Sequence, residues 1–302
     1  MNANRSDVDP WAVVAWATAD RAAAIRYACW LEVTAPKPGN VHPAARFADL
    51  SAGDFVAAME IVADELTATQ RSIGRRVLRS IRRTREETGT NVNLGIVLLL
   101  APLIAAEERF GIDGWRPERM QQVLRELSDR EGRLIGRAIG LAAAGGVRDR
   151  AVEDSRLDVS GPIDEAFDLL EAMKQAAPID AIAALYVNDF QDLTDRRVNE
   201  LNRNVRATGD VISGIVLTQL RWLAADGDSL IIRKCGAEVS EQVQRRTERC
   251  LDAVEKGDTT AIQSLDRWLR ADGHALNPGT TADLMAASLY IVLRRAGSAD
   301  KR

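Results

Sequence analysis

The spacing of apolar residues is the feature that most constrains what this 302-residue chain can fold into. Through nearly the whole sequence, apolar side chains return every three to four residues, which is the period of an amphipathic helix. Runs that alternate Val, Ile, Thr or aromatic residues with polar ones are few, and no Asn-Gly or Asp-Gly turn joins two such runs, as a β-hairpin requires. The sequence therefore predicts an all-α protein.

One helical segment is apolar on almost every side. Residues 92–109 carry hardly any polar face, which is typical of a helix buried at the centre of a bundle. The acidic, glycine-containing segment 145–162 is the most loop-like and is expected to be flexible. Helical segments of similar composition flank it, so we predict a single-domain multi-helix bundle over residues 1–302. The other predicted helices cover residues 11–32, 51–72, an Arg-rich segment ending at 87, 117–127, 130–144, 163–176, 179–202, 209–225, 230–255, 259–270 and 281–295.

The composition excludes several classes of protein. Apolar residues make up 46% and charged residues 28% of the chain, which is ordinary for a globular protein. The net charge of −4 disfavours a general nucleic-acid or membrane binder. Three widely spaced cysteines argue against a disulfide framework or a zinc site. The first residues lack the order of a signal peptide, and no apolar run reaches the roughly 18 residues of a membrane span, so we expect a cytoplasmic protein.

Four short segments break the helical pattern, and the first places a lysine between two prolines. Pro36 and Pro38 stiffen the backbone around Lys37, and Gly39 permits an unusual turn. Such a loop, which continues into Asn40, would hold the lysine in a fixed place for an anion. The alternative is a helix-terminating turn with an exposed lysine.

Two asparagines precede the most apolar helix. Asn91 and Asn93 lie where side chains cap a buried helix. They could also hydrogen-bond a base or a ribose, or hold a metal-bound phosphate. The local sequence leaves both interpretations open.

The third segment places an acid shortly before two basic residues. Asp228 precedes Arg233 and Lys234 at the start of a predicted helix, so acid and base can share one site. The alternative is a capping aspartate followed by a solvated basic pair. Gly236 lies within the helical pattern, where glycine costs about 1 kcal/mol relative to alanine. We therefore expect another backbone or a ligand to approach it closely.

The last predicted helix begins with Pro-Gly, two threonines and an aspartate. The backbone N–H groups from Gly279 onward and the hydroxyls of Thr280 and Thr281 would make a phosphate cradle at a helix N-terminus. Asp283 could hold a divalent cation there. The alternative is an ordinary helix start with capping hydroxyls and an acid in the first turn.

Basic residues outside these segments are weaker candidates. Seven arginines lie between residues 71 and 85, several at helical spacing, and suit either the phosphates of a ligand or a solvated helix face. His42 and His274 lack the partners of a zinc site, and His42, which follows the lysine loop, is the better candidate for proton transfer. The chain contains neither a P-loop motif nor a hydrolase nucleophile elbow.

Taken in order, the four segments resemble one family, the triphosphoribosyl-dephospho-CoA synthases. Its members carry Leu-Glu-Val, a spacer and Pro-Lys-Pro-Gly, as residues 31–39 do, and then a Gly-, Thr- or Asn-rich start of an apolar helix, as at 89–100. An Asp-Thr/Ser-Leu-Ile-x-Arg-Lys-x-Gly stretch and a Pro-Gly-x-x-Ala-Asp-Leu stretch follow, as at 228–236 and 278–284. The similarity extends over about residues 22–293.

The resemblance implies a group transfer between two nucleotides. The 2′-hydroxyl of 3′-dephospho-CoA attacks the anomeric carbon of ATP, adenine leaves, and the triphosphate stays attached. A reaction of this kind passes through an oxocarbenium-like state and needs a base, a donor to adenine and cations over the triphosphate. Glu32 is the implied general base, with Lys37 and Asp228 as further catalytic residues. The implied binding residues for ATP or the second substrate are Lys37, Pro38, Gly39, Asn40, Asn91, Asn93, Arg233, Lys234, Gly279, Thr280 and Thr281, and Asp228 and Asp283 would hold Mg²⁺.

Two stretches depart from the citrate-lyase type of this family. Residues 90–95 look like an archaeal and environmental branch, and residues 41–47 lack the acidic or His-Asp motif that usually follows the lysine loop. The acceptor is therefore left open: an ATP-dependent ribosyl or phosphoribosyl transferase for another cofactor precursor and a non-catalytic helical scaffold are the alternatives. The expected partners are ATP and dephospho-CoA or a related acceptor, without nucleic acid or membrane, and the apolar helices would suit a homodimer.

Overall fold

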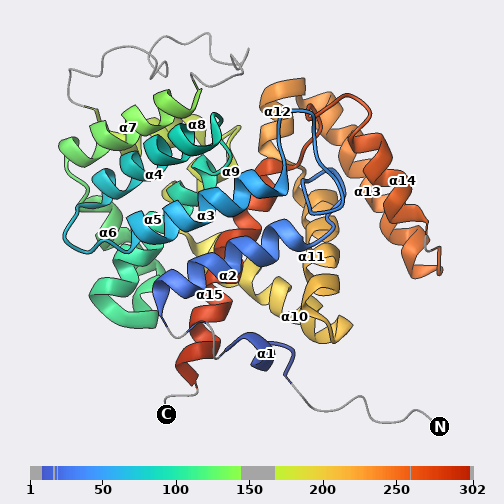
Figure 1. Cartoon of the computed structure of the whole chain (residues 1–302), viewed down its shortest axis with the longest axis horizontal. Coiled ribbons are helices and arrows are strands. Elements are labelled where there is room, and N and C mark those ends of the chain that lie inside the picture. The colour runs from blue at the N-terminus through green and yellow to red at the C-terminus, as the bar shows by residue number, and fades with distance from the viewer. Residues whose placement is uncertain (1–8, 16–17, 19, 144–166, 259, 300–302) are drawn as a thin grey trace.

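The computed structural model describes residues 9–15, 18, 20–143, 167–258 and 260–299. Within these ranges every regular element is a helix, and the single β-type pairing is an isolated bridge between His42 and Ala45 (Figure 1). The predicted all-α class is therefore confirmed. The segment 145–162 lies outside the described residues, and the division into one domain stays a prediction.

The described residues form helices in the following order. They are α1 Ala12–Ala15, α2 Arg21–Thr34, α3 Ala52–Leu66, α4 Ile73–Thr88, α5 Leu94–Phe110, α6 Pro117–Arg125, α7 Asp129–Ala143, α8 Leu169–Ala176, α9 Ala181–Val187, α10 Val198–Thr208, α11 Val211–Asp226, α12 Ser229–Cys235, α13 Ala237–Glu255, α14 Ala261–Leu269 and α15 Gly279–Ala299. A 3₁₀ turn covers Gly111–Trp115 and a π-helical turn covers Asp192–Arg197.

Two buried helices form the centre of the molecule. α5 corresponds to the apolar segment predicted at 92–109 and packs against α3, α4, α6, α7, α9 and α15. α15 is the second: its residues 284–293 are buried, and it packs against α2, α5, α11 and α12 (Figure 1). Because the start of α15 lies among these helices, side chains from distant parts of the sequence meet there.

Three predicted helices are interrupted in the structure. The segment 11–32 divides before α2, where Asp20 caps the new helix by accepting from the Ala23 amide at 2.8 Å. The segment 179–202 divides at Asp189 and Phe190, whose φ angles of 53° and 62° are incompatible with a helix. The segment 230–255 divides at Gly236, with φ of 89°. An alanine side chain at this glycine would meet no protein atom within 4 Å, so the expected approach of another backbone was wrong, and the approach of a ligand stays a prediction.

The arginines of α4 contact the protein itself. Glu65 of α3 is buried and forms ion pairs with Arg71, Arg79 and Arg83. Burial acts to raise the pKa of Glu65, but hydrogen bonds from Arg79 and Arg83 outweigh it and hold the pKa below its ordinary value. Arg76 is buried and pairs with Glu108 at 2.9 Å. These contacts fasten α3 and α5 to α4, so much of the arginine segment serves packing.

Within the described part of the chain, no helix combines the length and the apolar character that crossing a bilayer requires.

Candidate functional site

The lysine of the proline loop is fully buried. α2 ends at Thr34, and the chain turns back so that the Lys37 ammonium lies 2.8 Å from the Glu32 carboxylate and also donates to the Glu32 backbone carbonyl. Glu32 is itself buried in the last turn of α2. A buried charge is stable only when it is paired and hydrogen-bonded, and here the ammonium and the carboxylate are each other's partner. The alternative of an exposed lysine at a simple helix end was therefore wrong.

The rest of this loop is held by contacts from distant segments. Gly39 has φ of 79°, and a side chain there would come within 2.9 Å of the Pro278 ring, so only glycine fits. The Gly39 amide donates to Asp266 at 2.8 Å. The Asn40 side chain donates to Asn277 at 2.7 Å and accepts from Gln219 at the same distance. The polar groups of Gly39 and Asn40 are thus engaged in fixing the lysine loop.

Asp228 joins the start of α12 to the start of α15. One carboxylate oxygen accepts from the amides of Leu230 and Ile231, at 2.9 and 3.2 Å, and caps α12. The other accepts from the amide and the hydroxyl of Thr281, each at 2.7 Å. Burial raises the pKa of Asp228, and these four hydrogen bonds oppose that effect. A carboxylate has about four acceptor positions, so the geometry favours a positioning role over the predicted catalytic and metal roles.

The predicted phosphate cradle is filled by the protein. The Thr281 hydroxyl is bound to Asp228, and Thr280 accepts from the Ser229 hydroxyl at 3.1 Å. Both threonines are buried. A side chain at Gly279 would meet Leu230 at 2.6 Å. These residues pack α12 against α15 and leave no exposed hydroxyl at this helix start.

Asp283 differs from Asp228 because no hydrogen bond to its carboxylate is formed among the described residues. It lies one turn into α15, partly buried, with its carboxylate against the backbone of Gly95 at the start of α5. Burial raises the pKa of Asp283 well above its ordinary value, and the negative charges of Glu32 and Asp228 raise it further. A partly buried carboxylate without hydrogen bonds, crowded by two others, is a feature of functional sites.

A positive charge on α12 acts on this carboxylate. Arg233 of α12 lowers the pKa of Asp283, opposing the effect of burial, and pairs with Asp180. The other Asp180 oxygen caps α9 by accepting from the amides of Ile182 and Ala183, at 2.8 and 3.0 Å. Sequence reasoning missed Asp180 because it fell inside the predicted helix 179–202. The available signal was an aspartate directly before an apolar run, which is typical of a helix N-cap. Lys234 follows on α12 and is partly buried.

The two asparagines have different surroundings. Asn91 is exposed and accepts from the Leu94 amide at 3.2 Å, which is the capping interpretation. Asn93 is buried, and its amide group donates to Thr84 at 3.1 Å. Its carbonyl oxygen is buried and has no hydrogen-bond partner among the described residues. An unpaired buried oxygen is unfavourable in the protein alone, which makes Asn93 the stronger candidate for a ligand contact.

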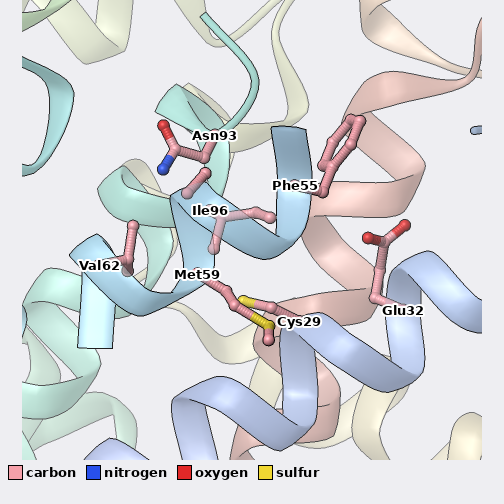
Figure 2. Close-up of a pocket in the computed structure, with 8 residues that line it drawn as sticks. Cys29, Glu32, Phe55, Met59, Val62, Asn93 and Ile96 are labelled. Carbon is pink, nitrogen blue, oxygen red and sulfur yellow. The ribbon is translucent and has the colours of Figure 1, made fainter. Parts of the chain in front are cut away.

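Asn93 and Glu32 line a narrow pocket between α2, α3 and α5 (Figure 2). Its space holds about one water molecule. In Figure 2 the Glu32 side chain rises from α2 toward the side of the pocket on which Phe55 lies. Burial raises the pKa of Cys29, as do Glu32 and Asp283, so this thiol stays protonated. The remaining lining residues, which sequence reasoning did not single out, are Phe55, Ala58, Met59, Val62 and Ile96.

The two histidines lie near the lysine loop. The pKa of His42 is lowered by burial and then by Arg270, so the imidazole is neutral near pH 7 and able to accept a proton. His274 lies 3.4 Å from Asp49 and contacts the Phe47 ring. No group of three or more His, Cys, Asp or Glu side chains in the described ranges is arranged to hold a metal ion without help from a ligand.

Comparison with known proteins identifies the family of the chain. Residues 18–302 match the family model of ATP:dephospho-CoA triphosphoribosyl transferase. A crystal structure from Archaeoglobus fulgidus, named as a candidate triphosphoribosyl-dephospho-CoA synthase, is 26% identical, with a TM-score of 0.62, and the match covers 81% of this chain and 98% of that one. No curated protein matches the chain at a significant level. The family match extends over nearly the whole sequence, and the chain therefore belongs to the ATP:dephospho-CoA triphosphoribosyl transferase family.

Proposed function

We propose that the chain transfers the triphosphoribosyl group of ATP to the 2′-hydroxyl of 3′-dephospho-CoA where α2, α5, α12 and α15 meet. The observation that carries the site assignment is the convergence of charged residues from three separate segments, around α2, α12 and α15. Glu32 and Lys37 form a buried pair, the Asp283 carboxylate lies against Gly95, and the charge of Arg233 acts on Asp283. Packing alone requires none of these charges to lie together.

The basic residues of α12 are proposed to bind the triphosphate. Arg233 is held by its ion pair with Asp180, which fixes its guanidinium for bidentate contact with phosphate oxygens. Lys234 adds a second positive charge on the last turn of the same helix. Lys37 is too deeply buried to reach the same phosphates without movement, so its proposed role is to hold and balance Glu32.

Asp283 is proposed to hold Mg²⁺ on the phosphates. Carboxylate oxygens are the ligands that Mg²⁺ prefers, and one or two carboxylates with substrate phosphates commonly complete its coordination. Asp283 fits because it lacks hydrogen bonds and lies among negative charges that a cation would relieve. Asp228 fits only if it gives up its bonds to Thr281. Bound Mg²⁺ would neutralise phosphate charge and fix the triphosphate.

Glu32 is proposed to accept the proton of the attacking 2′-hydroxyl. It borders the Asn93 pocket, and its negative charge acts on Asp283 of α15. The ion pair with Lys37 fixes the carboxylate in one orientation, which reduces the entropy lost on reaching the transition state. The unpaired Asn93 oxygen could accept from the amino group of adenine while the base departs.

The test is a product assay. Purified protein with ATP, Mg²⁺ and dephospho-CoA is expected to release adenine and yield an adduct heavier by one triphosphoribosyl unit, both followed by liquid chromatography and mass spectrometry. Glu32→Gln keeps the size of the side chain and removes the base, and we expect a loss of about 10²-fold or more in kcat. The matched control is Glu87→Gln, an exposed glutamate of α4. Full turnover by Glu32→Gln would remove Glu32 from the mechanism.

Three further proposals concern the location of the protein, nucleic-acid binding and the oligomeric state. A cytoplasmic location is supported by the three free cysteines, which suit a reducing compartment. The absence of nucleic-acid binding is supported by the net charge of −4. A homodimer is supported by Trp30 and Val56, which are exposed on the neighbouring helices α2 and α3. Light scattering of the purified protein measures the oligomeric state, and a mass of one chain would contradict the dimer.

A further inference from the structure

Gly95 occupies a place where its backbone does not require glycine. It is the second residue of α5, within the first turn of the most buried helix. Its φ angle is not in the left-handed region, unlike those of Gly39 and Gly89. Alanine is the stronger helix former at such a position. The reason for glycine must therefore lie in what surrounds it.

The space that a side chain would fill at Gly95 is taken by Asp283. An alanine Cβ there would lie 2.5 Å from the carboxyl carbon of Asp283, would overlap one of its oxygens, and would come within 2.7 Å of Ile182. Cβ atoms in proteins stay at least 3.0 Å from such neighbours. Asp283 and Ile182 are both contacted through the ends of flexible side chains, so an alanine would be accommodated by turning them away. The backbones of α5, α9 and α15 could stay in place.

We propose that Gly95 is a positioning residue, whose missing side chain makes the slot that holds the Asp283 carboxylate against the first turn of α5. The inference rests on the proposed function, in which Asp283 acts on the ATP phosphates. An alanine at position 95 would rotate the carboxylate out of this slot without removing it. A displacement of about 1 Å in a group that orients a substrate can lower turnover about a hundredfold.

The experiment compares two glycine substitutions. Gly95→Ala is the test variant, and Gly53→Ala is the matched control, because Gly53 is also the second residue of a helix, α3, and a side chain there meets only Ser51 at 3.5 Å. Adenine release is measured against MgATP concentration, together with the melting temperature. We expect both variants to melt at or above the wild-type temperature. Gly95→Ala should lose about a hundredfold in kcat and need more Mg²⁺, while the control stays within about twofold.

A second pair of variants separates positioning from a structural role. In an Asp283→Ala background the slot is empty, so adding Gly95→Ala should change the remaining activity by less than about twofold. A further large loss there would contradict the inference, because Gly95 would then act apart from Asp283. If Gly95→Ala alone fails to fold, the double variant is expected to fold, because the clash with Asp283 is gone; failure of both would also contradict it.

Failure of this inference can be told apart from failure of the proposed function. If Asp283→Ala is inactive and Gly95→Ala keeps wild-type kcat, the positioning role is refuted and the function stands. If the wild-type protein releases no adenine, the function is refuted. In that case a crystal structure of Gly95→Ala still decides the geometry: we expect the Asp283 carboxylate to have turned away from position 95, and an unmoved carboxylate would refute the slot.

Discussion

Removing the ammonium group of Lys37 is expected to destabilise the protein strongly. Lys37→Met keeps the length of the side chain but leaves the Glu32 carboxylate buried without its partner at 2.8 Å. Both side chains are almost wholly inaccessible, at 0% and 5% exposure, so water cannot replace the lost partner. Breaking a buried ion pair on one side lowers the free energy of unfolding by about 3–5 kcal/mol. Loss of the bond from Lys37 to the Glu32 carbonyl acts in the same direction.

The assay is urea unfolding of four proteins at one pH: wild type, Lys37→Met, Glu32→Gln and the double variant. We expect the double variant to recover about 2 kcal/mol or more relative to the sum of the single variants, because neither buried charge remains. Lys174→Met is the control, since Lys174 forms an exposed pair with Glu171 at 3.5 Å, worth about 0–1 kcal/mol. A loss below about 1 kcal/mol for Lys37→Met, equal to the control, would refute the buried pair.

Three further substitutions test other contacts. Asp228→Asn leaves a buried Thr281 donor without its acceptor, and we expect a loss of about 1–3 kcal/mol in a denaturant titration; an unchanged midpoint would contradict the link between α12 and α15. In metal-free buffer Asp283→Asn should raise the melting temperature at pH 8 and change it little near pH 4. The pKa of Asp283 is raised in the folded protein, so its contribution to stability is present at low pH and is lost as the pH rises through that pKa. Equal shifts at both pH values would argue against a raised pKa. Glu65→Gln weakens the pairs with the α4 arginines and should lower stability by about 1–3 kcal/mol without lowering kcat; a fall in kcat would give the arginine segment a part in catalysis.

Local chemistry was enough to predict much of the fold. The apolar pattern at 92–109 corresponds to α5 because a helix without a polar face has to be buried. The helix predicted from residue 51 corresponds to α3, whose N-cap Ser51 forms a capping box with Asp54, because this pattern needs only neighbours in sequence. The interruptions at Phe190 and Gly236 were missed because a helical pattern continues on both sides and the positive φ angles are set by tertiary packing.

The sequence indicated which residues lie together at the candidate site, but not which contacts each of them makes. Glu32, Lys37, Asp228 and Asp283 do converge, but sequence alone could not tell that Asp228 and Thr281 satisfy each other across two helices. The burial of Lys37 depends on partners far along the chain that fix its loop, which no local pattern reveals. The contact of Gly95 with Asp283 likewise joins residues far apart in the sequence, so no local pattern predicts it.

The most direct test of the site is a crystal structure of the protein with ATP and Mg²⁺, without acceptor. We expect the triphosphate beside Arg233 and Lys234, a metal ion on Asp283, and the ribose facing Glu32. ATP bound elsewhere, for example along the arginines of α4, with Asp283 touching neither metal nor phosphate, would contradict the proposed site.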